Sequence, residues 1–274
     1  MISIKSQREI ELMDKAGTIV ALVHKKMAEV VKPGISTLEL NRIAEEVIRA
    51  NDATPSFKNY QGFPCAVCTS INDMLVHGIP DHTILKDGDI ITIDVGACYK
   101  GYHGDSAWTY KVGNVTDEKV LKLLEVTEKS LYIGLEQAKV GNHIGDISHA
   151  IQEYVESFGF SLPPEYTGHG IGRSVHEDPY VPNVGKAGTG PLIKKGMCIA
   201  VEPMVFMGSA KCYTLDDDWG VKSYDHSWAA HYEHTIAILE DGYKIQGEIR
   251  KWSRNSGSRF WQNPYALHSH FTRR

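Results

Sequence analysis

Two acidic residues, Asp94 and Asp105, stand eleven positions apart in the stretch ITIDVGACYKGYHGD. The β-branched residues of positions 90–98 predict one strand, a turn follows at 99–101, and positions 102–112 predict a second strand of the same hairpin. If the loop between the strands has an even number of residues, two residues on opposite strands point to the same face when their position numbers sum to an odd number. Asp94 and Asp105 meet this condition. The two carboxylates then lie opposite or diagonal, roughly 5–8 Å apart. Like charges so close require either a proton on one acid or a cation between them.

Two further acids occur in equally apolar surroundings, Glu202 within GMCIAVEPMVF and Glu233 within AAHYEHTIAIL. An unpaired buried carboxylate costs several kcal/mol, and Lys and Arg are scarce in these segments, so a metal cluster explains the four acids better than ion pairs do. His169 lies between two glycines, which allow the backbone to approach a site closely. Carboxylates with one imidazole favour iron, manganese, cobalt or zinc.

The elements that would hold these side chains occur twice in the same order. Capping-box patterns at Ser6–Glu9 and Ser36–Glu39 predict two helices, and a strand-rich region follows at about residues 66–112. From Thr116 the chain repeats two helices and a strand-rich region, which extends to Leu239. KPGISTLELNRIAEEV and KVGNHIGDISHAIQEYV occupy matching places, which indicates a duplicated half. We therefore expect an α+β architecture with one shared sheet and helices on one of its faces.

The composition is that of a soluble globular protein. The chain has 274 residues, 42% hydrophobic and 23% charged, enough for one large domain or two small ones. No apolar run approaches the ~18 residues of a membrane span, and the N-terminus lacks a secretory signal. An odd number of cysteines, five, indicates reduced thiols in a cytosolic protein. Cys65 and Cys68 form a lone C-x-x-C, for which buried thiols are favoured over a structural zinc site.

The last 27 residues, 248–274, form a basic tail with six Lys/Arg and one Glu. The tail therefore carries +5, and because the whole chain carries −5, residues 1–247 carry about −10. Such an acidic body argues against a nucleic-acid enzyme. The tail is predicted to be a terminal extension or a vector-derived read-through without catalytic meaning, with contact to RNA or a ribosome as the alternative.

Six short motifs occur in the order seen in methionine aminopeptidases, and from residue 3 to about 247 the chain resembles the bacterial type I form. The motifs are HGIP at 77–80, IDVG around Asp94, HGD at 103–105, GHGIG at 168–172, VEP at 201–203 and YEHT at 232–235. The short intervals from His169 to Glu202 and on to Glu233 leave no room for the helical insertion of type II enzymes. The resemblance implies a single catalytic domain over residues 1–247 with the pseudo-two-fold creatinase/aminopeptidase ("pita-bread") fold.

The resemblance also implies two divalent metal ions. In that family pattern Asp105 and Glu233 bridge both ions, Asp94 binds one, and His169 and Glu202 bind the other. Two such ions can share a water and lower its pKa, and Glu202 would take the proton of that water. The implied ions are iron, manganese, cobalt or zinc, and a monovalent cation held by backbone carbonyls near Asn72 is a further expectation.

Two histidines match the family's catalytic positions that do not bind metal. By resemblance, His176 donates to the carbonyl oxygen as negative charge develops there. His77 contacts the region of the scissile nitrogen, where it positions the substrate or helps its protonation.

A pocket for the methionine side chain is implied at four matching positions: Tyr60, Phe63, Cys68 and Trp219. Aromatic and sulfur-bearing walls suit a thioether. Val175 stands where many bacterial members have Phe, and Phe57 where Cys is familiar, so we expect a departure from the usual pocket outline.

The implied activity is removal of the initiator methionine from nascent proteins whose second residue is small. We expect a cytoplasmic monomer that acts on nascent polypeptides, with the ribosome as a candidate partner, and neither membrane nor sequence-specific nucleic acid. One alternative is an Xaa-Pro aminopeptidase or prolidase, but these usually carry a separate N-terminal domain, and only about 90 residues precede Asp94. The other alternative, a catalytically silent scaffold, would have lost ligand residues, whereas all five are present.

Overall fold

The structure is a computed structural model that describes residues 1–247 of the 274. The prediction that residues 248–274 form a dispensable tail falls outside the described residues. The helices are α1 (Gln7–Val30), α2 (Thr37–Ala50), α3 (Glu118–Leu135) and α4 (Ile144–Glu156), with a 3₁₀ turn η1 (Tyr60–Gly62). None of the described helices has the length and apolarity that crossing a lipid bilayer requires.

The strands of the first half are β1 (Thr54–Pro55), β2 (Val67–Ile71), β3 (Met74–Val76), β4 (Ile90–Tyr99) and β5 (Tyr102–Lys111). Those of the second half are β6 (Thr167–Gly170), β7 (Glu177–Pro182), β8 (Cys198–Val201), β9 (Met204–Phe206), β10 (Cys212–Thr214), β11 (Val221–Ser223), β12 (Ala229–His231), β13 (His234–Leu239) and β14 (Gly242–Ile245). The predicted order of two helices and then strands, twice along the chain, is confirmed.

The hairpin predicted around the first two acids is confirmed as β4 and β5. Its loop is the two-residue turn Lys100-Gly101, and both residues have positive φ (50° and 79°), as the tight turns of twisted hairpins require. Asp94 pairs with Ala107, and Asp105 pairs with Gly96. The two acids are therefore diagonal neighbours on one face of the hairpin.

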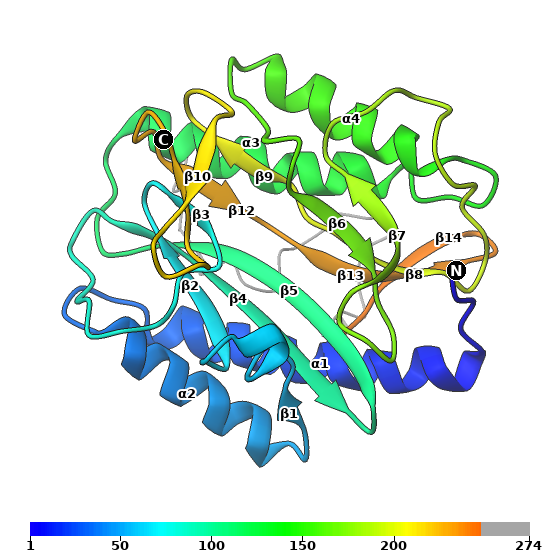
Figure 1. The fold of residues 1–274 in the computed structure, drawn as a ribbon, viewed down its shortest axis with the longest axis horizontal. Helices are drawn as coiled ribbons and strands as arrows, with labels where there is room; N and C mark the ends of the chain where they lie inside the picture. The colour runs from blue at the N-terminus through cyan, green and yellow to red at the C-terminus, as the bar shows by residue number, and fades with distance from the viewer. Residues whose placement is uncertain (248–274) are drawn as a thin grey trace, which may run out of the picture.

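Among residues 1–247 all strand pairings are antiparallel, and they form two principal and two small sheets. The expectation of one shared sheet is therefore wrong in detail, because in this part of the chain no strand of the first principal sheet pairs with a strand of the second. The first half forms β1-β4-β2 with β5 paired to β4, and the second forms β14-β13-β8-β6-β7. In Figure 1 α1 and α2 lie behind the strands of the first half, and α3 and α4 lie beside those of the second. The small sheets are β10-β11-β3 and β12-β9.

The two principal sheets meet where β5 approaches β13. The hydroxyl of Thr235 accepts a hydrogen bond from the amide of Asp105 (3.0 Å) and donates one to its carbonyl (2.8 Å). The amide of Glu233 donates to the carbonyl of Ala107 (2.9 Å). These bonds join the two halves at the positions of two of the predicted metal ligands.

The helix starts follow the capping patterns, one fully and one in part. At α1 the hydroxyl of Ser6 accepts from the amide of Glu9, whose carboxylate accepts from the amide of Ser6 (2.9 Å), so this capping box is confirmed. At α2 the hydroxyl of Ser36 accepts from the amide of Glu39 (3.1 Å). The carboxylate of Glu39 instead binds the guanidinium of Arg42 (2.8 Å). The second predicted capping box is therefore only half formed, because an arginine one turn ahead competes for the acid.

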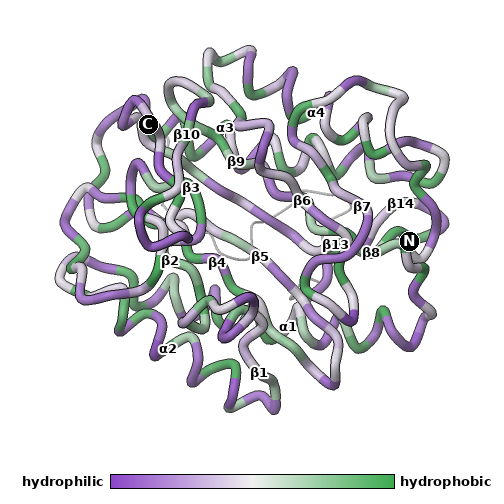
Figure 2. The backbone as a smooth tube through the Cα atoms, viewed as in Figure 1, coloured by the Kyte–Doolittle hydropathy of each residue, from purple (hydrophilic) through white to green (hydrophobic). Residues whose placement is uncertain are grey.

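The core lies between the helices and the sheets. Its main cluster combines α1 residues such as Val23 and Met27 with the β4 residues Ile91 and Ile93, all fully buried. Figure 2 shows apolar and polar segments alternating along α1 and α2, as expected of helices with one buried face. Helix α1 lies so close to β5 that a Cβ at Gly104 would be 2.7 Å from the amide nitrogen of Gly17. This contact fixes the backbone directly before Asp105.

Candidate active site

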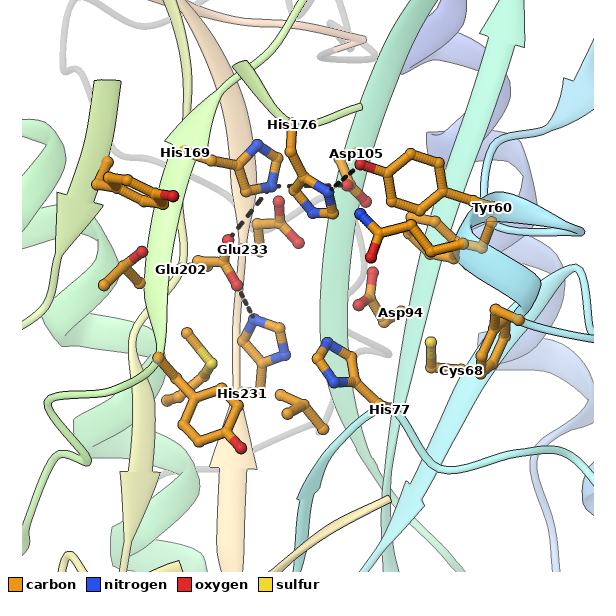
Figure 3. Close-up of a pocket in the computed structure, with 18 of the residues that line it drawn as sticks. Tyr60, Cys68, His77, Asp94, Asp105, His169, His176, Glu202, His231 and Glu233 are labelled. Atoms are coloured by element: carbon orange, nitrogen blue, oxygen red, sulfur yellow. Dashed lines mark hydrogen bonds and ion pairs between the residues drawn. The ribbon is translucent and has the colours of Figure 1, made fainter. Parts of the chain in front are cut away.

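The five predicted ligands lie together, although they come from both halves of the chain. Asp94 is on β4, Asp105 on β5 and His169 on β6, while Glu202 follows β8 and Glu233 precedes β13. Figure 3 shows these side chains around one common space. Nε2 of His169 is 3.4 Å from Oε1 of Glu202 and 4.0 Å from Oδ2 of Asp105. One ligand atom each of Asp105, His169 and Glu233 lies within 4.8 Å of the others.

Burial and mutual repulsion make these acids difficult to ionise. Burial raises the pKa of Asp94 to about 7, and burial together with the neighbouring carboxylates raises the pKa of Asp105 and Glu233 well above the usual range. Burial raises the pKa of Glu202 in the same direction. One oxygen each of Asp94, Asp105 and Glu233 is buried without a hydrogen-bond partner. Such oxygens need a proton or a cation, so the acids fit divalent ions.

His169 is prepared to act as a neutral ligand. Burial lowers its pKa to about 3, so the ring is uncharged at neutral pH. Its Nδ1 lies 2.9 Å from the carbonyl of Gly170, which requires that Nδ1 carries the hydrogen. The lone pair of Nε2 is then directed towards the acids, as in metal sites where the second ring nitrogen is fixed by a backbone carbonyl.

The two glycines beside His169 are predicted to let the backbone approach the site closely, but the close contacts that they allow are with neighbouring strands. A Cβ at Gly168 would lie 2.4 Å from the carbonyl oxygen of Ala200, and one at Gly170 only 2.1 Å from that of Asp178. The close contacts are with the neighbouring chain segments. The glycines therefore allow β6 to pack closely against its neighbouring strands, and this packing sets the position of His169.

The two predicted non-ligand histidines face the same cavity. Nδ1 of His176 is 2.9 Å from the hydroxyl of Tyr60, which leaves Nε2 for another partner, and its ring stands edge-on to His169 at 4.4 Å. His77 has a positive φ of 61°, an unfavourable conformation for a residue with a side chain and one that concentrates at functional sites. Its ring lies 6.5 Å from that of Trp219.

A cavity of about 630 Å³ opens beside the acids, within the size range of sites for small ligands. All four residues predicted for the methionine pocket line it: Tyr60, Phe63, Cys68 and Trp219. Phe63 and Trp219 stand edge-to-face at 5.1 Å. Phe57 lines the cavity too, and Val175 packs in the same buried apolar cluster, so both departures from the usual pattern lie at this pocket.

His231 lies in the site as well, although none of the six sequence motifs includes it. The residue is 1% exposed, and its Nε2 is 3.3 Å from Oε2 of Glu202. Figure 3 shows its ring between Glu202 and His77, at the cavity. Its position two residues before Glu233 in the sequence AHYEH was an available signal, because alternate residues of an extended segment share a face.

Neither cysteine of the C-x-x-C pair is part of a group of three or more potential metal ligands among residues 1–247. Cys65 and Cys68 are free thiols, and the described groups of potential ligands include neither. Asn72, near which a monovalent cation was predicted, has a φ of 52° and its carbonyl accepts the amide of Ala229 (2.8 Å). The monovalent cation stays a prediction.

Comparison with known proteins gives four findings. The sequence profile of metallopeptidase family M24 matches residues 11–240. Methionine aminopeptidase 1 of Bacillus subtilis is 55% identical over 245 residues, which are 89% of this chain and 98% of that protein. The crystal structure of methionine aminopeptidase from Thermotoga maritima superposes with a TM-score of 0.88 at 43% identity, covering 90% of this chain and 99% of that one. Prolidase from Pyrococcus furiosus shares the fold (TM-score 0.74) at 24% identity, and the match covers 66% of its length.

Proposed function

The chain belongs to metallopeptidase family M24 and, within it, to the methionine aminopeptidases, and from this membership we propose how its site removes N-terminal methionine. The observation that carries the proposal is the convergence of three buried acids, the half-buried Asp94 and a neutral imidazole. One oxygen each of Asp94, Asp105 and Glu233 is buried without a hydrogen-bond partner, and Nε2 of His169 faces Glu202 at 3.4 Å. The substrates are polypeptides that begin with methionine and have a small second residue. We propose that it acts on nascent chains in the cytoplasm.

Two divalent cations are proposed to be held by the five ligands: Asp94, Asp105, His169, Glu202 and Glu233. When bound, such ions polarise the scissile carbonyl and lower the pKa of a water that they share. Their identity among iron, manganese, cobalt and zinc depends on availability in the cell as much as on this ligand set.

The protein's own groups handle the protons. Glu202 accepts a proton from the water that adds to the carbonyl carbon, and the same proton passes to the leaving nitrogen as the carbon–nitrogen bond breaks. His176 donates from Nε2 to the carbonyl oxygen, on which negative charge grows, while Tyr60 holds its Nδ1 at 2.9 Å. His77 orients the peptide around the scissile nitrogen.

The cavity explains why methionine is the residue removed. A flexible thioether fills an irregular space between aromatic rings and makes favourable sulfur–aromatic contacts. Tyr60, Phe63, Cys68 and Trp219 supply such walls. Figure 3 shows Tyr60 and Cys68 across the cavity from Glu202 and His169.

Metal analysis combined with two peptides tests this proposal. The purified protein should contain divalent metal and hydrolyse Met-Ala-Ser in preference to a peptide with proline in second position. Asp105→Asn and Glu233→Gln should each lose metal and most activity while the far-ultraviolet circular dichroism stays that of the wild type. Asp241→Asn, the same type of change at an exposed position, serves as the control.

Two outcomes would overturn the proposal. Near-normal turnover in either ligand variant without added metal would exclude the metal assignment. Preference for the proline peptide would instead place the chain's specificity with the distant prolidases.

A further inference from the structure

The segment that carries His176, here called the His176 loop (residues 171–178), is closed by a single carboxylate. Oε1 of Glu177 accepts hydrogen bonds from the backbone amides of Arg173 (2.8 Å) and Ser174 (3.2 Å). The acid directly after the catalytic histidine therefore folds the preceding residues into a compact turn. Whatever holds Glu177 also holds the position of the neighbouring imidazole.

Glu177 is held by the first residues of the chain. Nζ of Lys5 is 2.8 Å from its Oε2, and the hydroxyl of Ser3 donates to the same oxygen (2.7 Å). The side chains of Lys5 and Glu177 are 5% and 18% exposed, so the ion pair is largely shielded from solvent at its lysine end and half-buried at its glutamate end. The amide of Lys5 in turn donates to the carbonyl of Gly196 (2.8 Å), which ties the lysine to the turn before β8.

Two weaker contacts join the same two segments. The guanidinium of Arg173 lies over the ring of Tyr102 at 4.7 Å and 3.8 Å from a carboxylate oxygen of Glu9. The terminal amine of Met1 pairs with Asp178 at 2.5 Å, although both groups are largely exposed and contribute little energy. We call residues 1–9 the N-terminal arm. None of its residues lines the cavity.

We propose that the partly buried Lys5–Glu177 ion pair positions His176, so that the N-terminal arm is a functional part of the active site. A buried ion pair is weak evidence for stability, because well-packed apolar residues would serve as well, but it selects one arrangement of the groups that it joins. The donor of a developing oxyanion needs that selectivity, since a displacement of about 1 Å can cost a hundredfold in rate. The inference rests on the role given to His176 in the proposed function.

Lys5→Met tests it, because methionine keeps most of the unbranched stem and removes the charge. The variant should lower kcat about tenfold with KM and metal content nearly unchanged, since the donor acts mainly in the transition state. Lys195→Met is the matched control: Lys195 forms an exposed ion pair with Glu240 at 3.0 Å, and its loss should leave kcat unaltered.

A double-mutant cycle separates positioning from general loosening of the fold. If Lys5 acts through His176, the tenfold effect of Lys5→Met should shrink to less than twofold in a His176→Ala background. An equal loss of kcat in both backgrounds, or no loss in the wild-type background, would overturn the inference.

A second variant covers the case in which the Lys5→Met protein fails to fold because the charge of Glu177 has lost its partner. Lys5→Met with Glu177→Gln leaves no unpaired charge and keeps an oxygen for the two amides of the loop. This double variant should fold and show the same tenfold loss of kcat, and wild-type kcat in it would contradict the inference. Wild-type protein that fails to cleave Met-Ala-Ser at all would instead contradict the proposed function.

Discussion

Removing the metal ions should leave a protein whose stability falls as pH rises. Burial raises the pKa of Asp94 from 3.8 to about 7, so between these values the folded metal-free protein holds a proton that the unfolded chain has released. A folded state that binds more protons than the unfolded state loses stability with rising pH. The loss is complete above the folded-state pKa of about 7 and absent below the unfolded value of 3.8.

The size of the effect follows from the shift. About three pKa units at 1.36 kcal/mol each amount to roughly 4 kcal/mol in full, of which roughly 3 kcal/mol falls between pH 5 and pH 8. Asp105, Glu202 and Glu233 have pKa values raised in the same direction and add to the decline. Divalent ions should reverse it, because they bind only the folded state; an ion at a hundred times its Kd adds about 2.7 kcal/mol.

The assay is urea unfolding of chelator-treated protein at pH 5 and pH 8, repeated with added manganese. Asp94→Asn should remove roughly 3 kcal/mol of the decline, and manganese should stabilise this variant less than it stabilises the wild type. Asp241→Asn, at an exposed position, should behave as the wild type. Metal-free wild type with constant or rising stability from pH 5 to pH 8, or an Asp94→Asn variant with an undiminished decline, would refute the reasoning.

Four further outcomes are expected. His176→Ala should lower kcat a hundredfold or more, on the order of 3 kcal/mol, with metal content by mass spectrometry equal to the wild type; loss of metal with kcat regained on resupply would make the residue a ligand. His231→Leu should lower kcat about tenfold in steady-state assays, whereas His231→Gln, which keeps a donor near the same carboxylate, should recover most of it. Truncation after Gly247 should leave turnover within a factor of about three, and a collapse of activity would show that the tail packs on the body. Intact mass should show that Met1 is retained, because the β-branched Ile2 collides with the site, while Ile2→Ala should lose it.

Much of the site followed from short-range rules. Parity along a hairpin predicted that Asp94 and Asp105 share a face, because side chains alternate strictly along paired strands. The burial of Glu202 and Glu233 followed from the apolar runs around them, since such runs fill the interior of sheets. The first capping box followed from residues only three positions apart.

Features that depend on distant contacts were not accessible in this way. Lys5 meets Glu177 across 172 positions, and no periodicity or motif relates them. His231 was overlooked because the resemblance directs attention to matching motifs, whereas its role depends on which carboxylate lies beside it. The role predicted for Gly170 was wrong because the sequence does not show that the carbonyl oxygen of Asp178 lies against this glycine.

The division of the site between two halves has a consequence for how the protein is made. Synthesis proceeds from the N-terminus, so the residues of the hairpin with Asp94 and Asp105 are made well before Glu233 has been added. Until β13 is made, the hairpin also lacks the hydroxyl of Thr235 that bonds to Asp105. A chain on the ribosome is therefore catalytically inert until it is nearly finished. Removal of methionine from other new chains therefore depends on copies that are already complete, because each copy becomes active only once Glu233 and β13 are in place.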